Sequence, residues 1–522
     1  DPSDLRAFDP SSTGGDARRA YSLRIDSLGR NGSSSRRSTR PWILVAIAAA
    51  ACVLALLING WFFWSRPLRV SQGPGAPTIA KPDQPRPAGE LQKIADANPV
   101  AIMIKLDGAV WEPAGGPGPA ERDVLAARRL RLRSGRATLA FLSGVTLTLE
   151  GPGDLELISI DRVFCREGRL RARVPKGAEG FVVGSPGSAV VDMGTEFAIN
   201  VEADGRSRVM VFEGAAEAAL LGTAGSPERT QLVERSKAFD LDPRRRRITE
   251  SGAQTTGFVT ATPLSVAPLV LGPAYAGAVL RSLPRGYWRF ESISGGAIPN
   301  EVQGGAALRV NGPVKIAGGP QGNGHAVFKA NEPDQFLYSN EIWETTRQPG
   351  HAIELWFAAE GISHASLVGL FPAVERRNNA GNRQYVHTFF VELTARDRQS
   401  LYRPASVRFL HRWPLDFTIG DNLMSQHLYI PQRWHHVVAQ KNGNRMELYF
   451  DGEPDHSMTL DIDHPTVSCR LVVGRRTPDL AYSHDLRTFV GRLDELAVYN
   501  HPLSADEIRQ HFRLANLEDL PP

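Results

Sequence analysis

The distribution of hydrophobic residues divides the chain into three kinds of segment. Residues 42–64 form one apolar run of about 23 residues without a charged side chain. Residues 97–249 and 285–516 instead contain short stretches in which apolar and polar residues alternate, separated by glycine and other turn residues. Alternation with a period of two is typical of β-strands that bury one face. We therefore predict a transmembrane helix followed by two all-β domains.

The apolar run is long enough to cross a membrane, because about 20 apolar residues span roughly 30 Å of hydrocarbon as a helix. Aromatic side chains lie at both ends, with Trp42 at the start and residues 61–64 at the end, where they favour the interface. A signal peptide is disfavoured, because the run is longer than a typical signal core and no small-residue cleavage pattern follows it. A buried globular helix is disfavoured too, because the run is apolar on every face.

Arginines predict the orientation of this helix. More of them precede the run than follow it: Arg30, Arg36, Arg37 and Arg40 before, Arg66 and Arg69 after. This asymmetry places the N-terminus in the cytoplasm and the remainder outside. We expect residues 1–41 to be a disordered cytoplasmic tail, residues 65–96 to be an extended Pro/Gly-rich linker, and residues 250–284 to link the two β-domains.

The composition of the chain bears on its binding partners and on whether disulfides or metal ions stabilise it. The 60 Lys and Arg residues nearly balance 56 Asp and Glu residues, and part of the net charge of +4 is local, at the juxtamembrane arginines and residues 244–247. Nucleic acid is therefore not an expected partner. Of the three cysteines, Cys52 lies in the apolar run, and Cys165 and Cys469 lie in different predicted domains. Neither a disulfide framework nor a cysteine zinc site is expected.

The first β-domain contains a family-specific motif. Residues 190–199 have the sequence VVDMGTEFAI, and residues 212–214 (FEG) supply a turn before the next strand. We expect Gly194 to allow a tight turn, Thr195 to cap it through its hydroxyl, and Phe197 to point into the core. Over about 150 residues this part resembles the FecR domain, the extracytoplasmic module of membrane-bound sigma-factor regulators. The resemblance implies a position in the periplasm, tethered to the bacterial inner (cytoplasmic) membrane.

The second β-domain contains three recognisable pieces: a strand–hairpin–strand unit over residues 434–452, a closing strand over residues 491–499, and a short helix that Ser504 caps with Glu507 at the capping-box position. On these pieces, nearly all of residues 285–516 resembles the LamG-like jellyroll, a concanavalin A-like β-sandwich. The fold class expected for the chain is all-β, with one N-terminal transmembrane helix.

A concanavalin A-like sandwich can host a glycosidase, which needs two carboxylates a fixed distance apart. Laminarinase-type members carry a Glu-x-Asp-x-x-Glu string on one strand, and the nearest string here, residues 354–360, lacks the central acid. Asp494 and Glu495 are adjacent, so a regular strand would point them to opposite faces. His435 and His436 are separated in the same way, which disfavours a metal pair. We expect no enzymatic activity and no catalytic residues.

Calcium is the one cofactor that the resemblance leaves open. Several sandwiches of this kind clamp their first and last strands with a calcium ion, through a carboxylate from each strand and backbone carbonyls. Glu291 and Asp494 are the candidate ligands here. Calcium takes six to eight oxygen ligands, and the sequence does not supply the others.

Aromatic residues outside the predicted strands are the candidates for ligand binding, because sugar rings stack on Trp and Tyr. Four of them fall in predicted loops: Trp343, Tyr402, Trp413 and Tyr482. Three other tryptophans are assigned to the core: Trp288, Trp356 and Trp434.

The leading hypothesis is a non-catalytic, membrane-anchored binding or sensor protein. Its LamG-like domain would bind a glycan or a cell-envelope protein, and its FecR-like domain would relay or scaffold. The alternative is an anti-sigma regulator of an extracytoplasmic-function sigma factor, which needs a sigma-binding segment that residues 1–41 are too short and polar to supply. Because the sequence starts at Asp1, an upstream cytoplasmic domain stays open. A glycan-degrading enzyme is the third, disfavoured hypothesis.

Overall fold

The structure is a computed structural model of the 522-residue chain. It describes residues 98–112, 118–222, 225–252, 254–260, 266–319, 322–345, 350–373, 376–377, 383–384, 388–396, 402–412, 420–460, 467–478 and 486–517. The predicted cytoplasmic tail, the transmembrane helix at residues 42–64 and the linker at residues 65–96 lie outside these residues. Within the described ranges, the helices are too short or too polar to span a membrane.

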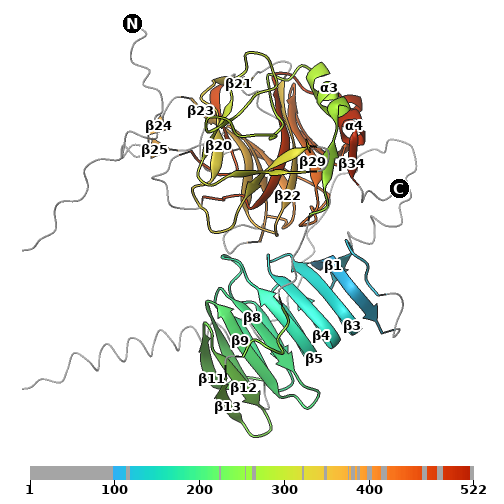
Figure 1. The fold of residues 1–522 in the computed structure, drawn as a ribbon, viewed down its shortest axis with the longest axis vertical. Helices are drawn as coiled ribbons and strands as arrows, with labels where there is room; N and C mark the ends of the chain where they lie inside the picture. Colours follow the sequence, from blue (N-terminus) through green and yellow to red (C-terminus); the bar gives the residue numbers. More distant parts are fainter. Residues whose placement is uncertain are drawn as a thin grey trace, which may run out of the picture. The chain divides into compact units, whose positions relative to one another are not determined.

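The first part of the described chain is one 13-stranded sheet (Figure 1). Its strands are β1 (Pro99–Trp111), β2 (Val124–Ala126), β3 (Arg128–Phe141), β4 (Thr146–Ser159), β5 (Arg162–Arg173), β6 (Val182–Ser185), β7 (Ser188–Asp192), β8 (Glu196–Val201), β9 (Ser207–Glu213), β10 (Ala215–Leu221), β11 (Pro227–Glu234), β12 (Ala238–Asp242) and β13 (Arg247–Ser251).

This sheet branches at β5. Residues 162–164 of β5 pair in parallel with β6, and residues 168–173 pair antiparallel with β8. One branch continues through β6, β7 and β10 to β11, and the other continues through β8, β9 and β12 to β13. On the far side of β5, the strands β4, β3, β1 and β2 follow in antiparallel order.

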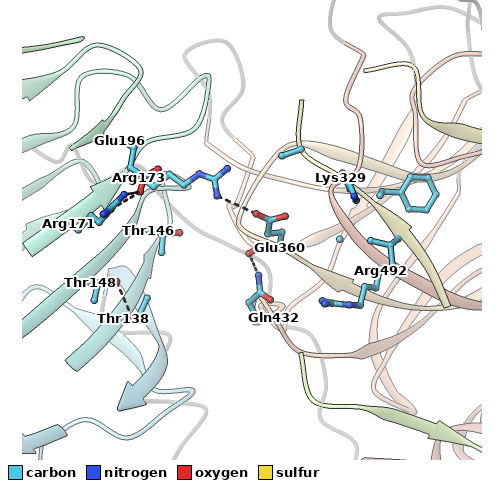
Figure 2. A pocket seen from close by; sticks show the side chains of 14 residues that line it. Thr138, Thr146, Thr148, Arg171, Arg173, Glu196, Lys329, Glu360, Gln432 and Arg492 are labelled. Atoms are coloured by element: carbon cyan, nitrogen blue, oxygen red, sulfur yellow. Dashed lines mark hydrogen bonds and ion pairs between the residues drawn. The ribbon is translucent and has the colours of Figure 1, made fainter. Parts of the chain in front are cut away.

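The alternating pattern of the sequence explains how this sheet buries one face. Leu139 on β3, Leu147 on β4 and Leu170 on β5 are fully buried in one apolar cluster. The residues between them are polar: the hydroxyls of Thr138 and Thr148 lie 3.2 Å apart on adjacent strands (Figure 2). The period-two alternation seen in the sequence thus sorts the side chains of β3–β5 into an apolar core and a polar outer face.

The turn between β7 and β8 has the geometry expected of the VVDMGTEFAI motif. Gly194 has a φ of +90°, in the left-handed region that favours glycine. Asp192 accepts hydrogen bonds from the Gly194 N–H (2.8 Å) and from the Thr195 hydroxyl. Phe197 is fully buried, as predicted. The predicted turn and core roles of these residues are confirmed, but the FecR family itself stays a prediction.

The second part of the described chain contains an eight-stranded and a nine-stranded sheet. The eight-stranded sheet is built from β15 (Gly286–Trp288), β18 (Lys315–Gly318), β19 (Gly324–Phe328), β22 (Gly350–Ala359), β29 (His435–Asn442), β30 (Arg445–Phe450), β31 (Glu453–Thr459) and β33 (Gly491–Tyr499). The nine-stranded sheet is built from β16 (Ala297–Ile298), β17 (Leu308–Asn311), β20 (Phe336–Tyr338), β21 (Trp343–Thr345), β23 (Ala365–Pro372), β26 (Phe389–Leu393), β27 (Val407–His411), β28 (Asp421–Met424) and β32 (Val467–Val473).

The two sheets share one apolar core, which makes this part a β-sandwich. Alternate residues of β22, such as Leu355 and Phe357, join Val391 of the nine-stranded sheet in a single buried cluster. Trp288 is also buried there, as predicted. Residues from opposing sheets interdigitate in this way when two sheets pack face to face. A small separate hairpin is formed by β24 (Arg376–Arg377) and β25 (Arg383–Gln384).

The other face of the eight-stranded sheet is covered by segments from the two ends of this part (Figure 1). Strand β14 (Leu269–Leu271) pairs with β34 (Ala515–Leu517), and helices α3 (Pro273–Arg281) and α4 (Ala505–Arg513) lie beside them. Ser504 caps α4 in the predicted capping box. We call β14 and α3 the strap. The strap occupies part of the predicted linker, residues 250–284, so the second domain starts earlier than the sequence pattern indicates.

The strap is held by aromatic packing. Tyr275 of α3 is fully buried, and its hydroxyl accepts a hydrogen bond of 2.8 Å from the indole N–H of Trp356. Both residues belong to a second buried cluster that also contains Val279 and Ile508. Trp434, predicted to be a core residue, lies in the same cluster.

Replacing Tyr275 tests whether the strap is part of the domain. We expect Tyr275→Ala to lower the free energy of unfolding of the full chain by about 3 kcal/mol, because it removes a large buried side chain and a hydrogen bond. Urea denaturation followed by tryptophan fluorescence measures this change. Leu280→Ala is the matched control, since Leu280 lies on the same helix and is 38% exposed. Equal stability of the two variants would contradict the assignment.

Candidate functional site

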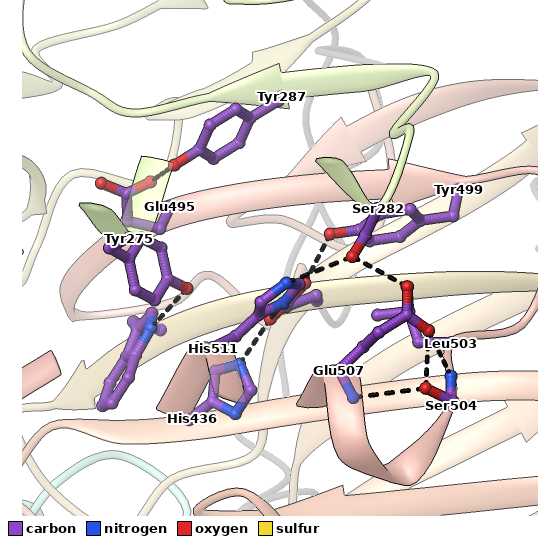
Figure 3. A network of polar contacts seen from close by, with 12 residues as sticks. Tyr275, Ser282, Tyr287, His436, Glu495, Tyr499, Leu503, Ser504, Glu507 and His511 are labelled. Carbon is purple, nitrogen blue, oxygen red and sulfur yellow. Dashed lines mark hydrogen bonds and ion pairs between the residues drawn. The ribbon is translucent and has the colours of Figure 1, made fainter. Parts of the chain in front are cut away.

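A polar network lies between the eight-stranded sheet and its covering helices (Figure 3). At its centre is Glu354 of β22, whose side chain is fully buried. Its carboxylate is bonded to Nε2 of His436 (2.8 Å) and Nδ1 of His511 (2.9 Å), and it accepts the hydroxyl of Tyr499 (2.6 Å). His436 and Tyr499 come from neighbouring strands, and His511 comes from α4. The network therefore fastens the C-terminal helix to the sheet.

The charges of this network are set by burial and by each other. Burial by itself would raise the pKa of Glu354, but the charge of His511 and the hydrogen bonds from both histidines outweigh it and hold this pKa well below its ordinary value. Burial opposes the charged form of His511 as well, yet the Glu354 carboxylate raises the His511 pKa above its usual value. Burial and the Glu354 charge both raise the pKa of Tyr499. The stable state is an ion pair within a closed site.

The network extends from α4 to the end of α3. The Ser282 hydroxyl lies 3.3 Å from Nε2 of His511 and donates to Oε1 of Glu507 at 3.0 Å. Glu507 also closes the capping box with Ser504. These contacts join the strap, α4 and the sheet through hydrogen bonds between polar side chains. Buried polar groups without partners would be costly in this interface.

Asp494 and Glu495 lie in a β-bulge of β33. Glu354 opposes Ala497, and Trp356 opposes Asp494, so β33 has one extra residue in this interval. Glu495 has a φ of +51°.

The bulge puts both carboxylates on the covered face of the sheet. Leu493 and Leu496, which flank them, both pack in the sandwich core. The prediction that a regular strand separates the two carboxylates to opposite faces is therefore wrong.

The two carboxylates are buried and bonded to protein groups. Oδ2 of Asp494 accepts the Asn323 side-chain amide at 3.0 Å, and Glu495 is bonded to the hydroxyl of Tyr287 and to Arg289. Burial raises the pKa of Asp494 well above its ordinary value, and the neighbouring Glu495 charge adds to this. Burial also raises the pKa of Glu495, against the opposing charge of Arg289. Neither acid is open to a substrate.

The two candidate calcium ligands, Glu291 and Asp494, both contact residues 323–324. Glu291 accepts the Gly324 N–H at 2.6 Å and pairs with Arg289 at 2.9 Å, while Asp494 contacts the preceding residue, Asn323. Across the described ranges, no three His, Cys, Asp or Glu side chains are grouped so as to hold a metal ion. As arranged, the two carboxylates are tied to protein donors and a guanidinium. A calcium ion there stays a prediction.

The two adjacent histidines of β29 occupy opposite faces, as predicted. Nδ1 of His435 lies 3.0 Å from Asp451, and its Nε2 accepts the Ile430 N–H at 2.9 Å. His436 faces the covered side, where it meets Glu354. Both are buried and bonded within the protein, so the structure supports the interpretation of them as structural residues.

The four candidate ligand-binding aromatics have different outcomes. Trp343 belongs to strand β21, is 2% exposed and packs edge-on against Trp288 at 5.9 Å between ring centroids, so its assignment to an open loop is wrong. Its apolar ring fills the end of the sandwich core. Tyr402 is half-buried. Trp413 and Tyr482 lie outside the described residues.

Tyr402 lies beside a charged group on the nine-stranded sheet. The guanidinium of Arg408 is stacked 4.3 Å from the centre of the Tyr402 ring, and the ring of His364 is 5.8 Å away. Arg408 and His364 both contact the buried carboxylate of Glu392, which also pairs with Arg487 at 2.7 Å. Arg408 is 4% exposed, and its side-chain nitrogens are bonded to Glu392 and Asn422. The half-buried Tyr402 is therefore the candidate contact for a ligand at this place.

The signals for these two groups in the sequence are weak. Glu354 belongs to an incomplete catalytic string, and its histidine partners, His436 and His511, lie far from it in the chain. Arg408 and Glu392 alternate with apolar residues on strands β27 and β26. A charged residue inside an otherwise apolar strand is the signal that could have marked both groups.

One family of known proteins matches part of the second domain. The model of the concanavalin A-like lectin/glucanases superfamily matches residues 350–509. Among curated proteins, none matches the chain.

Three solved structures illustrate the structural likeness. The binding domain of botulinum neurotoxin serotype G has 10% identity and a TM-score of 0.31, with coverage of 44% of this chain and 51% of that one. Domain 4 of AbnA, an arabinanase from Geobacillus stearothermophilus, has 13% identity and a TM-score of 0.30, with coverage of 47% and 99%. A pentraxin from Limulus polyphemus has 13% identity and a TM-score of 0.26, with coverage of 33% and 73%.

The chain spans about half the length of the neurotoxin binding domain. At these identities and TM-scores the likenesses carry no argument about function. The family match and the two-sheet sandwich nevertheless agree on the architecture. Residues 350–509 form a LamG-like jellyroll domain of the concanavalin A-like superfamily.

Proposed function

We propose that this chain is a non-catalytic binding protein, anchored to the bacterial inner membrane, whose jellyroll domain binds a glycan or a cell-envelope protein in the periplasm. The observation that carries the proposal is the closed outer face of the eight-stranded sheet. Glu354, a carboxylate on the central strand β22, is enclosed by His436, His511 and Tyr499. A family of lectins and glucanases supplies the fold, and the buried carboxylate favours the lectin side of that family.

The requirements of glycosidic-bond hydrolysis also favour a non-catalytic role. One carboxyl group must protonate the leaving oxygen, and a second must act as nucleophile or base across the same bond. Glu354, Asp494 and Glu495 are all buried and bonded to protein groups. A substrate would have to displace the strap and α4 to reach any of them.

The FecR-like resemblance of residues 97–249 supports a second role, relay or scaffolding next to the membrane. The well-formed Asp192–Thr195 turn is consistent with that resemblance. Sigma-factor regulation is the alternative, and it depends on a cytoplasmic sigma-binding segment. Pull-down with a full cytoplasmic region as bait separates the two: capture of a sigma factor would favour the alternative.

Tyr402 gives a direct test of ligand binding. We expect the full chain to bind members of a glycan array, and Tyr402→Ala to weaken that binding by up to about tenfold, because contact with an aromatic ring contributes on the order of 0.5–1.5 kcal/mol. Leu280→Ala, on the exposed side of α3, is the control and should bind like the wild type. Repeating the array in EGTA tests the calcium prediction at Glu291 and Asp494. Binding to no glycan in either condition would move the proposal to a protein ligand.

Substitution of Glu354 distinguishes a structural role of this carboxylate from a catalytic one. We expect Glu354→Gln to lower the free energy of unfolding by about 3–5 kcal/mol near pH 6, because it breaks a buried ion pair. Glu453→Gln is the control. Glu453 pairs with Arg509 of α4, the helix that also carries His511, but its side chain is 46% exposed, so we expect this substitution to lower the free energy of unfolding by less than about 1 kcal/mol. Thermal unfolding of the full chain measures both.

The pH dependence has a definite sign. Because the folded state raises the pKa of His511, the stability from its charge is fully present below about pH 6.5 and is lost as the pH rises through the raised value. Because the pKa of Glu354 is lowered, its contribution is present above about pH 4.3 and is lost as the pH falls through the lowered value. The difference between wild type and Glu354→Gln should thus be largest between these limits. A variant of unchanged stability that had lost a hydrolytic activity would overturn the non-catalytic role.

A further inference from the structure

The outer face of β3–β5 in the first domain carries more arginines than carboxylates. Strand β4 lies between β3 and β5, and its Glu150 is the register neighbour of Arg136 on one side and Arg169 on the other. Oε2 of Glu150 lies 2.8 Å from Nε of Arg136, and Oε1 lies 2.5 Å from a terminal nitrogen of Arg169. One carboxylate therefore holds two guanidinium groups.

The same arrangement recurs further along β4. Asp154 is hydrogen-bonded to Nε of Arg129 at 2.6 Å, and Nε of Arg131 lies 3.8 Å from its other oxygen. Glu156 pairs with Arg166 at 2.8 Å. We call these five arginines, with the carboxylates between them, the arginine face: Arg129, Arg131, Arg136, Arg166 and Arg169.

The arginines of this face are more exposed than most of the carboxylates that they contact, so the accessible surface is more positive than the numbers of the two residue types indicate. The side chains of Arg136 and Arg169 are 37% and 44% exposed, whereas that of Glu150 is 15% exposed. Arg129 is 40% exposed and Asp154 is 13% exposed. Glu150 and Asp154 lie low between the strands, and the guanidinium groups of their arginines extend over them. At the edge of the face the acids are as accessible as the bases: Glu156, which pairs with Arg166, is 40% exposed, and Glu112, beside Arg131, is 48% exposed. Only part of each planar, five-donor guanidinium is used by its carboxylate, which leaves donors directed to solvent.

Other ion pairs of the same domain lack this inequality. Arg208 pairs with Asp240, and the two side chains are 50% and 45% exposed. Arg246 pairs with Glu228, at 66% and 45%. In these pairs each arginine has its own acid, and the acid is nearly as accessible as the base. The excess of accessible guanidinium is thus a property of the arginine face and not of exposed arginines in this domain generally.

We propose that the arginine face binds a linear acidic polysaccharide through its carboxylate or sulfate groups. Guanidinium forks match planar or tetrahedral oxyanions in a bidentate manner. Arginines on β3 and β5 are separated by the width of two strand spacings, about 10 Å, and successive outward residues lie about 7 Å apart along a strand. A flexible chain with repeated anionic groups can therefore contact several of them at once, which increases its affinity.

Two other polyanions fit this face less well. Bases of single-stranded nucleic acid stack on open aromatic rings, but Phe164, the aromatic residue of this face, is half-buried with the Arg166 guanidinium 5.2 Å from its ring centre. A lipid surface is favoured by inserted apolar side chains, and the large apolar residue exposed on β3–β5 within the described ranges is Ile158. The proposal does not depend on ligand binding by the jellyroll domain.

Binding of the full chain to immobilised heparin and to polygalacturonate, measured by biolayer interferometry at several salt concentrations, tests the proposal. We expect salt-sensitive binding that the double substitution Arg136→Gln and Arg169→Gln weakens about tenfold or more, since two charge-assisted contacts are lost. The matched control is Arg206→Gln with Arg208→Gln, two exposed arginines of the same domain that have carboxylate partners of comparable exposure. Its binding should change less than twofold.

A third variant keeps the test decisive if the double substitution unfolds the domain. Glu150→Gln removes the carboxylate between Arg136 and Arg169 and should strengthen polysaccharide binding several-fold, which a purely structural role of this group does not predict. Equal weakening by the arginine-face and control variants would overturn the proposal, as would an absence of binding to both polysaccharides. Stronger binding to phosphatidylglycerol vesicles or to an oligonucleotide than to either polysaccharide would also overturn it.

Discussion

The second domain depends on the requirement that its eight-stranded sheet bury both faces. Strand β22 is buried at all ten positions, so the face turned away from the sandwich needs a cover of its own. The strap and α4 supply that cover, and the buried ion pair of Glu354 with His511 fixes α4 in position. Removing water from a carboxylate is costly unless partners replace it, which explains why three side chains, those of His436, His511 and Tyr499, converge on this one group. The same enclosure makes the face unsuitable for catalysis.

Much of the fold was predictable from local patterns. Period-two alternation predicted strands such as β3 and β4, and the Gly194 turn and the Ser504 capping box follow from short-range chemistry. Three features were not predictable in this way. The bulge at Asp494 and Glu495 depends on pairing with β22, the strap is a short segment that becomes ordered through Trp356, and Trp343 is buried through Trp288. Each of these is decided by a residue distant in sequence, which periodicity does not register.

The candidate sites, too, depend partly on local sequence and partly on contacts between residues that are distant in the chain. Residue type alone selected Tyr402 as a ligand-binding candidate, but the feature that distinguishes it is the Arg408 guanidinium stacked on its ring and held by Glu392. On the first domain, arginines and acids are nearly equal in number along the chain, and the excess appears only when β3, β4 and β5 are placed side by side. Charge in both places is a property of the sheet surface, and net composition does not reveal it.

The pairing of β14 with β34 has a mechanical consequence. These strands are the first and last of the second domain, and they lie next to each other with residues 269–271 opposite residues 515–517. The chain therefore enters and leaves the domain within about one strand spacing, roughly 5 Å. A load applied through the preceding linker would act first on this three-residue pair and on α3, and the sandwich core would be spared. A pull on the two ends of this domain therefore acts on their pairing, and the distance across the sandwich does not have to change.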